Sequence, residues 1–319
     1  MNIDLSVSVA GVSFRNPVLS ASGTFGHGLE MCNFVSPAAI GGLVSKTVTR
    51  KPRPGNPPPR MAETASGMLN SIGLENRGIE YYQKEVLPSL RDCGARIITN
   101  IGAESIGDFA YLAEVLDSED IISAFEVNLS CPNIQGGKLP FSTDCKLAAE
   151  AIAAVRKVTK KPIWAKLSPN VTSISEIALA VEGAGADAVT AINTILGMAV
   201  DWRRREPLLS TTFGGLSGPA IKPVALRMVV ECARCVKIPI VAVGGVRSAE
   251  DVLEFMVAGA TVVQVGTWNF VDPSGIIQIL DELQKLLAGA NVSRVRDLIG
   301  SLRAPTPAKF EGVDATVER

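Results

Sequence analysis

A cysteine follows a predicted buried strand directly, within the stretch NLSCPN at 128–133. The turn after Cys131 is restricted by Pro132, whose ring fixes its own backbone angle. A thiol near lysines can have a lowered pKa and act as a base or nucleophile. An isolated cysteine is more often a small core residue. Its place at the end of a strand favours the chemical role for Cys131, because barrel active sites lie there.

Two lysines end mostly apolar stretches, Lys46 after GLVS and Lys166 after PIWA. A lysine is seldom buried without a partner. At the end of a strand each would supply fixed positive charge to an anionic reduced ring or to a substrate carboxylate. Either lysine alone could simply reach solvent. Two at matching strand ends favour a binding site.

Several asparagines also fall at strand ends or in long loops: Asn70, Asn100, Asn128, Asn133 and Asn193. Each side chain offers hydrogen-bond donors and acceptors. A convergent set could bind a planar ring that carries amides and carbonyls, such as a pyrimidine or an isoalloxazine. Any single one of them could instead be a turn residue.

Glycines gather near the end of the chain, in VAVGG (241–245), in QVGT (264–267) and at Gly218. In α/β barrels a phosphate commonly lies on the loops after the last two strands, where backbone N–H groups can approach it. The alternative is that the glycines serve tight turns. No GxGxxG sequence opens a helix, so the chain itself gives no support for a bound dinucleotide.

Eight short apolar runs carry these residues, and each is followed by a segment of helical period. They begin at Pro17, Gly42, Arg96, Phe125, Pro162, Ala188, Pro239 and Thr261. Their even spacing and polar C-terminal ends favour a (β/α)8 TIM barrel, with one mouth, over an open doubly wound sheet. We expect one domain over 1–303 and a flexible tail over 304–319.

The connecting segments add detail. The alternating N-terminus MNIDLSVSVAGVSF predicts a hairpin. Three long loops, 48–76, 131–141 and 195–218, are predicted to be irregular and to overhang the mouth. Helix starts that resemble capping boxes are predicted where a serine precedes an acid by three residues, and Gly259 predicts a helix end. The serines are Ser105, Ser173 and Ser248.

The composition limits the possible functions. The net charge of −1 gives no support for nucleic-acid or membrane-surface binding, which also disfavours a tRNA-modifying flavin barrel. No apolar run reaches the roughly 18 residues of a membrane span, and no export signal is apparent, so we expect a cytoplasmic protein with free thiols. With His27 as sole histidine we expect no metal site, and we interpret Cys232 and Cys235 as mid-helix packing.

Taken in order, the motifs between about 20 and 270 resemble the dihydroorotate dehydrogenase family. They are ASGTFG, SKT, NSIGLEN, NIG, VNLSCPN, AKLSPN, INT, SGP, GGV and VGT. The resemblance implies an FMN barrel that oxidises dihydroorotate to orotate in pyrimidine synthesis. It implies that Cys131 removes the C5 proton while hydride passes from C6 to flavin N5.

The resemblance also assigns binding roles by position. FMN would be bound by Ser22, Lys46, Thr47, Asn100, Asn128, Lys166 and Ile192, with its phosphate at Gly218, Gly244, Gly245, Gly266 and Thr267. The substrate would be bound by Lys46, Asn70, Ser71, Ile72, Gly73, Leu74, Asn128, Asn193 and Thr194.

A cysteine at 131 resembles the soluble class 1 enzymes, and GTFGHG looks more like their NAD-linked 1B type than the fumarate-using type. The 1B type implies a heterotetramer. Two copies of this chain would associate with two electron-transfer subunits carrying FAD and a [2Fe-2S] cluster. Two alternatives remain open: a flavin reductase similar to dihydropyrimidine dehydrogenase, and a non-redox phosphate-binding barrel such as an isomerase or aldolase.

Overall fold

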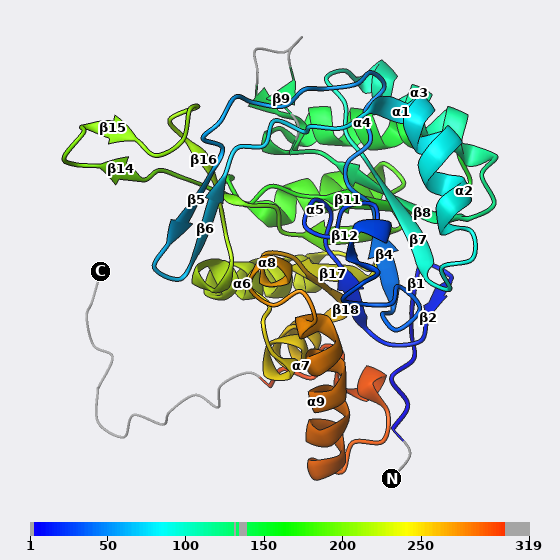
Figure 1. Cartoon of the computed structure of the whole chain (residues 1–319). Coiled ribbons are helices and arrows are strands. Elements are labelled where there is room, and N and C mark those ends of the chain that lie inside the picture. Colours follow the sequence, from blue (N-terminus) through cyan, green and yellow to red (C-terminus); the bar gives the residue numbers. More distant parts are fainter. Residues whose placement is uncertain (1–2, 131, 134–138, 304–319) are drawn as a thin grey trace, which may run out of the picture.

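The structure is a computed structural model that describes residues 3–130, 132–133 and 139–303. Its centre is a closed barrel of parallel strands that follow one another in chain order (Figure 1). The strands are β3 (Val18–Ser20), β4 (Gly42–Val44), β7 (Arg96–Ile101), β8 (Ile122–Asn128), β11 (Ile163–Lys166), β12 (Ala188–Ala191), β17 (Ile240–Val243) and β18 (Ala260–Val265). The (β/α)8 barrel is therefore confirmed, and each predicted apolar run overlaps one of these strands.

The barrel strands are buried on both faces. Every residue of β4, β11, β12 and β17 is buried, as near-continuous apolar runs predict for a parallel sheet. The predicted hairpin is also present, as β1 (Val7–Val9) paired antiparallel with β2 (Val12–Phe14). Its Phe14 ring lies 6.1 Å from the ring of Trp164 in β11, so the hairpin extends the barrel core.

Helices surround the barrel (Figure 1). They are α1 (Gly78–Tyr81), α2 (Leu87–Leu90), α3 (Ile106–Asp117), α4 (Cys145–Arg156), α5 (Ile174–Gly183), α6 (Lys222–Cys235), α7 (Ala249–Ala258), α8 (Trp268–Val271) and α9 (Gly275–Gly289). A π-helical turn (Tyr82–Val86) joins α1 to α2.

The predicted helix starts are confirmed as N-caps. Ser105, Ser173 and Ser248 each accept a hydrogen bond from the backbone N–H three residues on. A reciprocal capping box is recorded only at Ser248, where the Asp251 side chain also accepts from the backbone of the cap. Gly259 ends α7 with a φ of 122°, a conformation that favours glycine.

All three long loops contain strands, and two of these loops pair with each other. Segment 48–76 contains β5 (Met61–Thr64) and β6 (Gly67–Asn70), and segment 195–218 contains β13 (Ile195–Gly197) and β16 (Gly214–Ser217). These strands form one antiparallel sheet in the order β13-β16-β6-β5. The prediction of irregular loops was wrong here because each segment completes its backbone hydrogen bonds with the other.

A hairpin, β14 (Val200–Asp201) with β15 (Glu206–Pro207), projects from this sheet (Figure 1). The third loop contains β9 (Pro132–Asn133) paired with β10 (Leu139–Pro140). Cys131, residues 134–138 and the predicted tail 304–319 lie outside the described residues, and the single-domain boundary at 303 stays a prediction. Within the described ranges, no helix has the length and apolar character that a bilayer crossing needs.

Candidate active site

A cavity of about 670 Å³ lies where the barrel strands end, and the sheet made by β5, β6, β13 and β16 contributes to its wall. This is the end of a barrel at which active sites are built. Every described residue with a predicted binding role lines it. They are Ser22, Lys46, Thr47, Asn70, Ser71, Ile72, Gly73, Leu74, Asn100, Asn128, Lys166, Ile192, Asn193, Thr194, Gly218, Gly244, Gly245, Gly266 and Thr267. The structure brings these residues together; their individual roles stay predictions.

The glycines form one part of the wall, after β16, β17 and β18. The φ of Gly218 is 91° and that of Gly245 is 81°, so both adopt conformations that disfavour a side chain. A Cβ on Gly245 would lie 2.7 Å from the Lys222 backbone nitrogen, and one on Gly218 would lie 2.8 Å from the Gly67 Cα. The turns therefore need glycine sterically, and the same lack of side chains leaves backbone facing the cavity. Such a surface suits an anion such as a phosphate.

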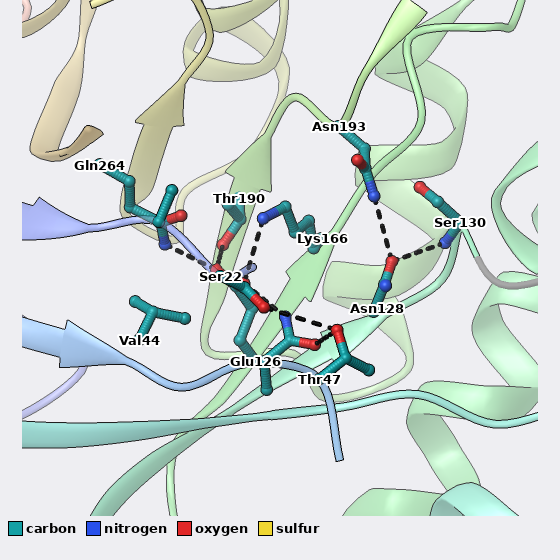
Figure 2. A network of polar contacts seen from close by, with 12 residues as sticks. Ser22, Val44, Thr47, Glu126, Asn128, Ser130, Lys166, Thr190, Asn193 and Gln264 are labelled. Carbon is teal, nitrogen blue, oxygen red and sulfur yellow. Dashed lines mark hydrogen bonds and ion pairs between the residues drawn. The ribbon is translucent and has the colours of Figure 1, made fainter. Parts of the chain in front are cut away.

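A buried carboxylate beneath the cavity was missed by the sequence reasoning (Figure 2). Glu126 in β8 is fully buried and accepts four hydrogen bonds. The donors are Asn100 Nδ2 at 2.7 Å, Lys166 Nζ at 3.3 Å, Thr190 Oγ1 at 3.1 Å and Gln264 Nε2 at 2.6 Å. A signal was present, because an acid inside the apolar run FEVN needs partners when buried.

The two lysines differ electrostatically. Lys166 is 5% exposed and forms an ion pair with Glu126, so its charge is largely balanced. Lys46 is half-buried at the end of β4, and among the described carboxylates none forms an ion pair with it. The expectation of unbalanced positive charge from both lysines therefore holds for Lys46 alone.

Two hydroxyl groups extend the hydrogen bonds around Glu126 to the residues that follow β3 and β4. Thr47 Oγ1 donates to Asn100 Oδ1 at 2.7 Å, and Ser22 Oγ lies 3.5 Å from Thr47 Oγ1. Since Asn100 also donates to Glu126, a continuous polar chain crosses the ends of β3, β4, β7 and β8.

Three of the predicted asparagines, Asn128, Asn193 and Asn70, line the cavity and form hydrogen bonds there. Asn128 Oδ1 accepts from Asn193 Nδ2 and from the Ser130 backbone N–H, each at 3.2 Å (Figure 2). Asn70 lies in β6 and donates to the Gly215 carbonyl at 3.3 Å. Asn133 lies in β9, but its side chain is not among those that the structure describes. The cavity wall thus presents side-chain amides from both the barrel and the antiparallel sheet of β13, β16, β6 and β5.

The predicted base, Cys131, lies outside the described residues. Ser130, the residue directly before it, lines the cavity. Three residues on the same wall, Arg60, Glu75 and Asn56, were not predicted as site residues. Arg60 Nη2 lies 2.5 Å from Glu75 Oε2, and Asn56 Nδ2 donates to Ser71 Oγ at 2.9 Å. Only their place in the long loop 48–76 pointed to them.

The remaining candidates lie away from the cavity wall. His27 packs on Tyr82 with 5.3 Å between ring centroids. Burial lowers the pKa of His27; the Glu30 carboxylate opposes that shift and the Lys46 ammonium adds to it. Cys232 and Cys235 belong to α6, as predicted, but at its C-terminal end rather than its middle. In the described part of the chain, no group of three or more His, Cys, Asp or Glu side chains could hold a metal ion.

Comparisons with known proteins agree with this geometry. A sequence profile described as "Dihydroorotate dehydrogenase" matches residues 4–287. A protein of Geobacter sulfurreducens named "Dihydroorotate dehydrogenase B (NAD(+)), catalytic subunit" is 48% identical over 299 residues, which cover 94% of this chain and 98% of that protein. A protein of the same name from Bacteroides thetaiotaomicron is 46% identical, with 94% of this chain and 99% of that protein covered.

Proposed function

The chain belongs to the dihydroorotate dehydrogenase family, and we propose that it is an FMN-containing catalytic subunit that oxidises dihydroorotate to orotate for pyrimidine synthesis, with NAD as final acceptor. The observation that carries the proposal is the shared cavity. Residues from distant parts of the chain, to which the family resemblance assigns flavin and dihydropyrimidine binding, line one cavity at the barrel mouth.

The residues present fit a flavin mononucleotide. The turns at Gly218, Gly244 and Gly245 line the cavity with backbone, which suits a phosphate, and at each of them a Cβ would lie 2.7–2.8 Å from a neighbouring atom of the chain. Lys166, Asn100 and Thr47 offer the ammonium, amide and hydroxyl groups that can contact a polar ring edge. When bound, the flavin would supply a hydride acceptor at its N5.

The substrate would lie against the asparagine side chains and the antiparallel sheet of β13, β16, β6 and β5. Asn70, Asn128 and Asn193 can read the amide and carbonyl edges of a dihydropyrimidine. Lys46, whose charge has no carboxylate partner among the described residues, suits the substrate carboxylate. Ser71, Ile72, Gly73, Leu74 and Thr194 complete the predicted set, and all line the cavity.

The chemical step assigned to the protein is proton removal at C5 by the Cys131 thiolate. The C5–H electrons form the new double bond, and the hydride leaves C6. Ser130 on the cavity wall precedes the base directly, so the chain enters this segment beside the substrate region. The thiolate must be present for the step, so the rate should rise with pH through the thiol pKa.

The relatives' name "catalytic subunit" points to a separate partner. We propose that a homodimer of this chain associates with two subunits that carry FAD and a [2Fe-2S] cluster, in the cytoplasm. The chain offers no GxGxxG sequence for a nicotinamide cofactor, so transfer to NAD would occur on that partner.

The direct test is anaerobic addition of dihydroorotate to the purified, yellow protein, followed by its visible spectrum. Bleaching of the flavin absorbance by dihydroorotate and not by dihydrouracil supports the proposal. Bleaching by dihydrouracil would indicate a dihydropyrimidine reductase instead, and a colourless protein would indicate a non-redox barrel. Cys131→Ala should keep the flavin and lose most of the bleaching rate at neutral pH. The exposed Cys32 is the matched control, and Cys32→Ala should bleach at the normal rate.

A further inference from the structure

The fully buried carboxylate of Glu126 has no part in the chemistry described above. Asn100 and Lys166 line the cavity, whereas Glu126 does not. It lies behind them and contacts both through one oxygen, with Oε1 2.7 Å from Asn100 Nδ2 and 3.3 Å from Lys166 Nζ. Any effect of Glu126 on the site must therefore pass through these two side chains or through its charge.

We propose that Glu126 is a positioning residue that fixes Lys166 and Asn100 beneath the flavin and, as an ionised counter-charge, keeps the flavin harder to reduce. This inference rests on the proposed function, since it needs a flavin in the cavity. It goes further by assigning the control of redox potential to a residue that contacts neither flavin nor substrate.

The hydrogen bonds favour the ionised form of Glu126. All four of its partners donate, two to each oxygen, so every acceptor direction of the carboxylate is used. A proton on Oε1 would face the N–H donors of Asn100 and Lys166, and a proton on Oε2 would need the Thr190 hydroxyl or the Gln264 amide to turn and accept. The partners belong to β7, β11, β12 and β18, so a single side chain ties together strands on several sides of the barrel.

Stability is a poor reason for such a pair. Removing two charges from water costs several kcal/mol per ion, and well-packed apolar residues often replace a buried ion pair without loss of stability. Trp164, which pairs with Glu126 in the neighbouring strand, is buried and apolar, so this barrel could have continued its apolar packing. A buried pair placed directly beside a binding cavity is better explained by its effect on the ligand.

The sign of the effect follows from charge. Reduction adds negative charge to a flavin, so an unbalanced Lys166 ammonium would favour the reduced form. Glu126 cancels most of that charge from a site with no solvent exposure, where screening is weak. The reduced flavin is then a better electron donor to a partner subunit. Lys46 keeps its positive charge for the substrate carboxylate.

The test is Glu126→Gln in the flavin-loaded protein, equilibrated anaerobically with a redox dye. The neighbouring Gln264 Oε1 is buried and has no hydrogen-bond partner among the described atoms, so it can accept from the new amide after a flip. We expect the reduced-to-oxidised ratio at a fixed dye potential to rise roughly tenfold, equal to a shift of about +30 mV for a two-electron couple. A ratio equal to the wild type overturns the proposal.

Thr190→Val is the matched control. It removes a hydrogen bond to the same carboxylate and keeps the charge, so its ratio should stay within about twofold of the wild type, a shift of no more than about 9 mV. A shift as large as that of Glu126→Gln would assign the effect to packing and refute the charge argument. A wild-type protein without flavin would instead refute the proposed function, so the two failures are distinguishable.

A measurement on the wild type covers the case in which Glu126→Gln does not fold. The infrared difference spectrum between the reduced and oxidised protein, recorded with and without ¹³C-labelled glutamate, reports the protonation of carboxyl groups. We expect no label-sensitive carbonyl band of a protonated acid upon reduction. Among the described residues Glu126 is the only buried glutamate, so such a band at the frequency of a buried acid would be assigned to it, and the counter-charge role would be wrong.

Discussion

The amide nitrogen of Asn193 donates a 3.2 Å hydrogen bond to the side-chain oxygen of Asn128 and so joins the ends of β12 and β8. Asn193→Ala leaves this oxygen with the Ser130 N–H alone. We expect about 1–3 kcal/mol of lost binding, or roughly ten- to hundredfold weaker orotate affinity, with the flavin retained. Titration of the flavin spectrum with orotate measures this. The exposed amide of Gln278 serves as control, and Gln278→Ala should bind normally.

A side chain at Gly245 should damage the glycine turn. Its φ is 81°, and a Cβ there would lie 2.7 Å from the Lys222 backbone nitrogen. Gly245→Ala is expected to lower the free energy of unfolding by about 1–3 kcal/mol and to reduce flavin retention, as measured by urea unfolding and by absorbance ratio. Gly183 in α5 has open space around it, so Gly183→Ala should not destabilise. Equal stability of both variants would contradict this argument.

Burial should make His27 titrate below its ordinary value. The folded-state pKa is lowered from 6.5, so the unfolded chain binds more protons at mildly acidic pH. The stability contributed by neutral His27 is therefore complete above 6.5 and is lost as the pH falls below it. As the sole histidine, it gives one imidazole NMR signal to follow. His27→Gln should lose less stability on acidification, and a titration midpoint at or above 6.5 would contradict the prediction.

The cysteines should differ strongly in reactivity. Cys232 is fully buried, which raises its pKa to about 12, whereas Cys32 is exposed. Because the thiolate is the nucleophile, iodoacetamide at mildly alkaline pH should label Cys32 and leave Cys232 unlabelled until the protein is unfolded in urea. Peptide mass spectrometry measures both sites. Labelling of Cys232 in the folded protein at the rate of Cys32 would show that α6 opens readily.

Much of the barrel could be predicted because its signals are local. An apolar run of β-branched residues forms a strand buried on both faces wherever helices cover it, and a serine with an acid three residues on caps a helix. These patterns placed β11 and the start of α7 correctly. Polar residues at the strand ends then predicted the mouth, since parallel strands end on the same side.

The sheet over the mouth could not be predicted in the same way. Gly215 in β16 pairs with Asn70 in β6, two residues separated by most of the barrel in sequence. Strands of three or four residues that contain glycine have weak local preferences, and their stability comes from the partner strand. Sequence reasoning therefore identified long segments over the site but not the sheet that they form.

By itself the sequence determined which strands exist, that they are buried on both faces, and which polar side chains stand at their ends, because these properties depend on neighbouring residues. Only the tertiary structure decided which charges meet. Lys46 and Lys166 look equivalent along the chain. Closure of the barrel nevertheless brings the Glu126 carboxylate to Lys166, whereas no described carboxylate forms an ion pair with Lys46. Charge balance depends on distances across the barrel, and no local pattern encodes them.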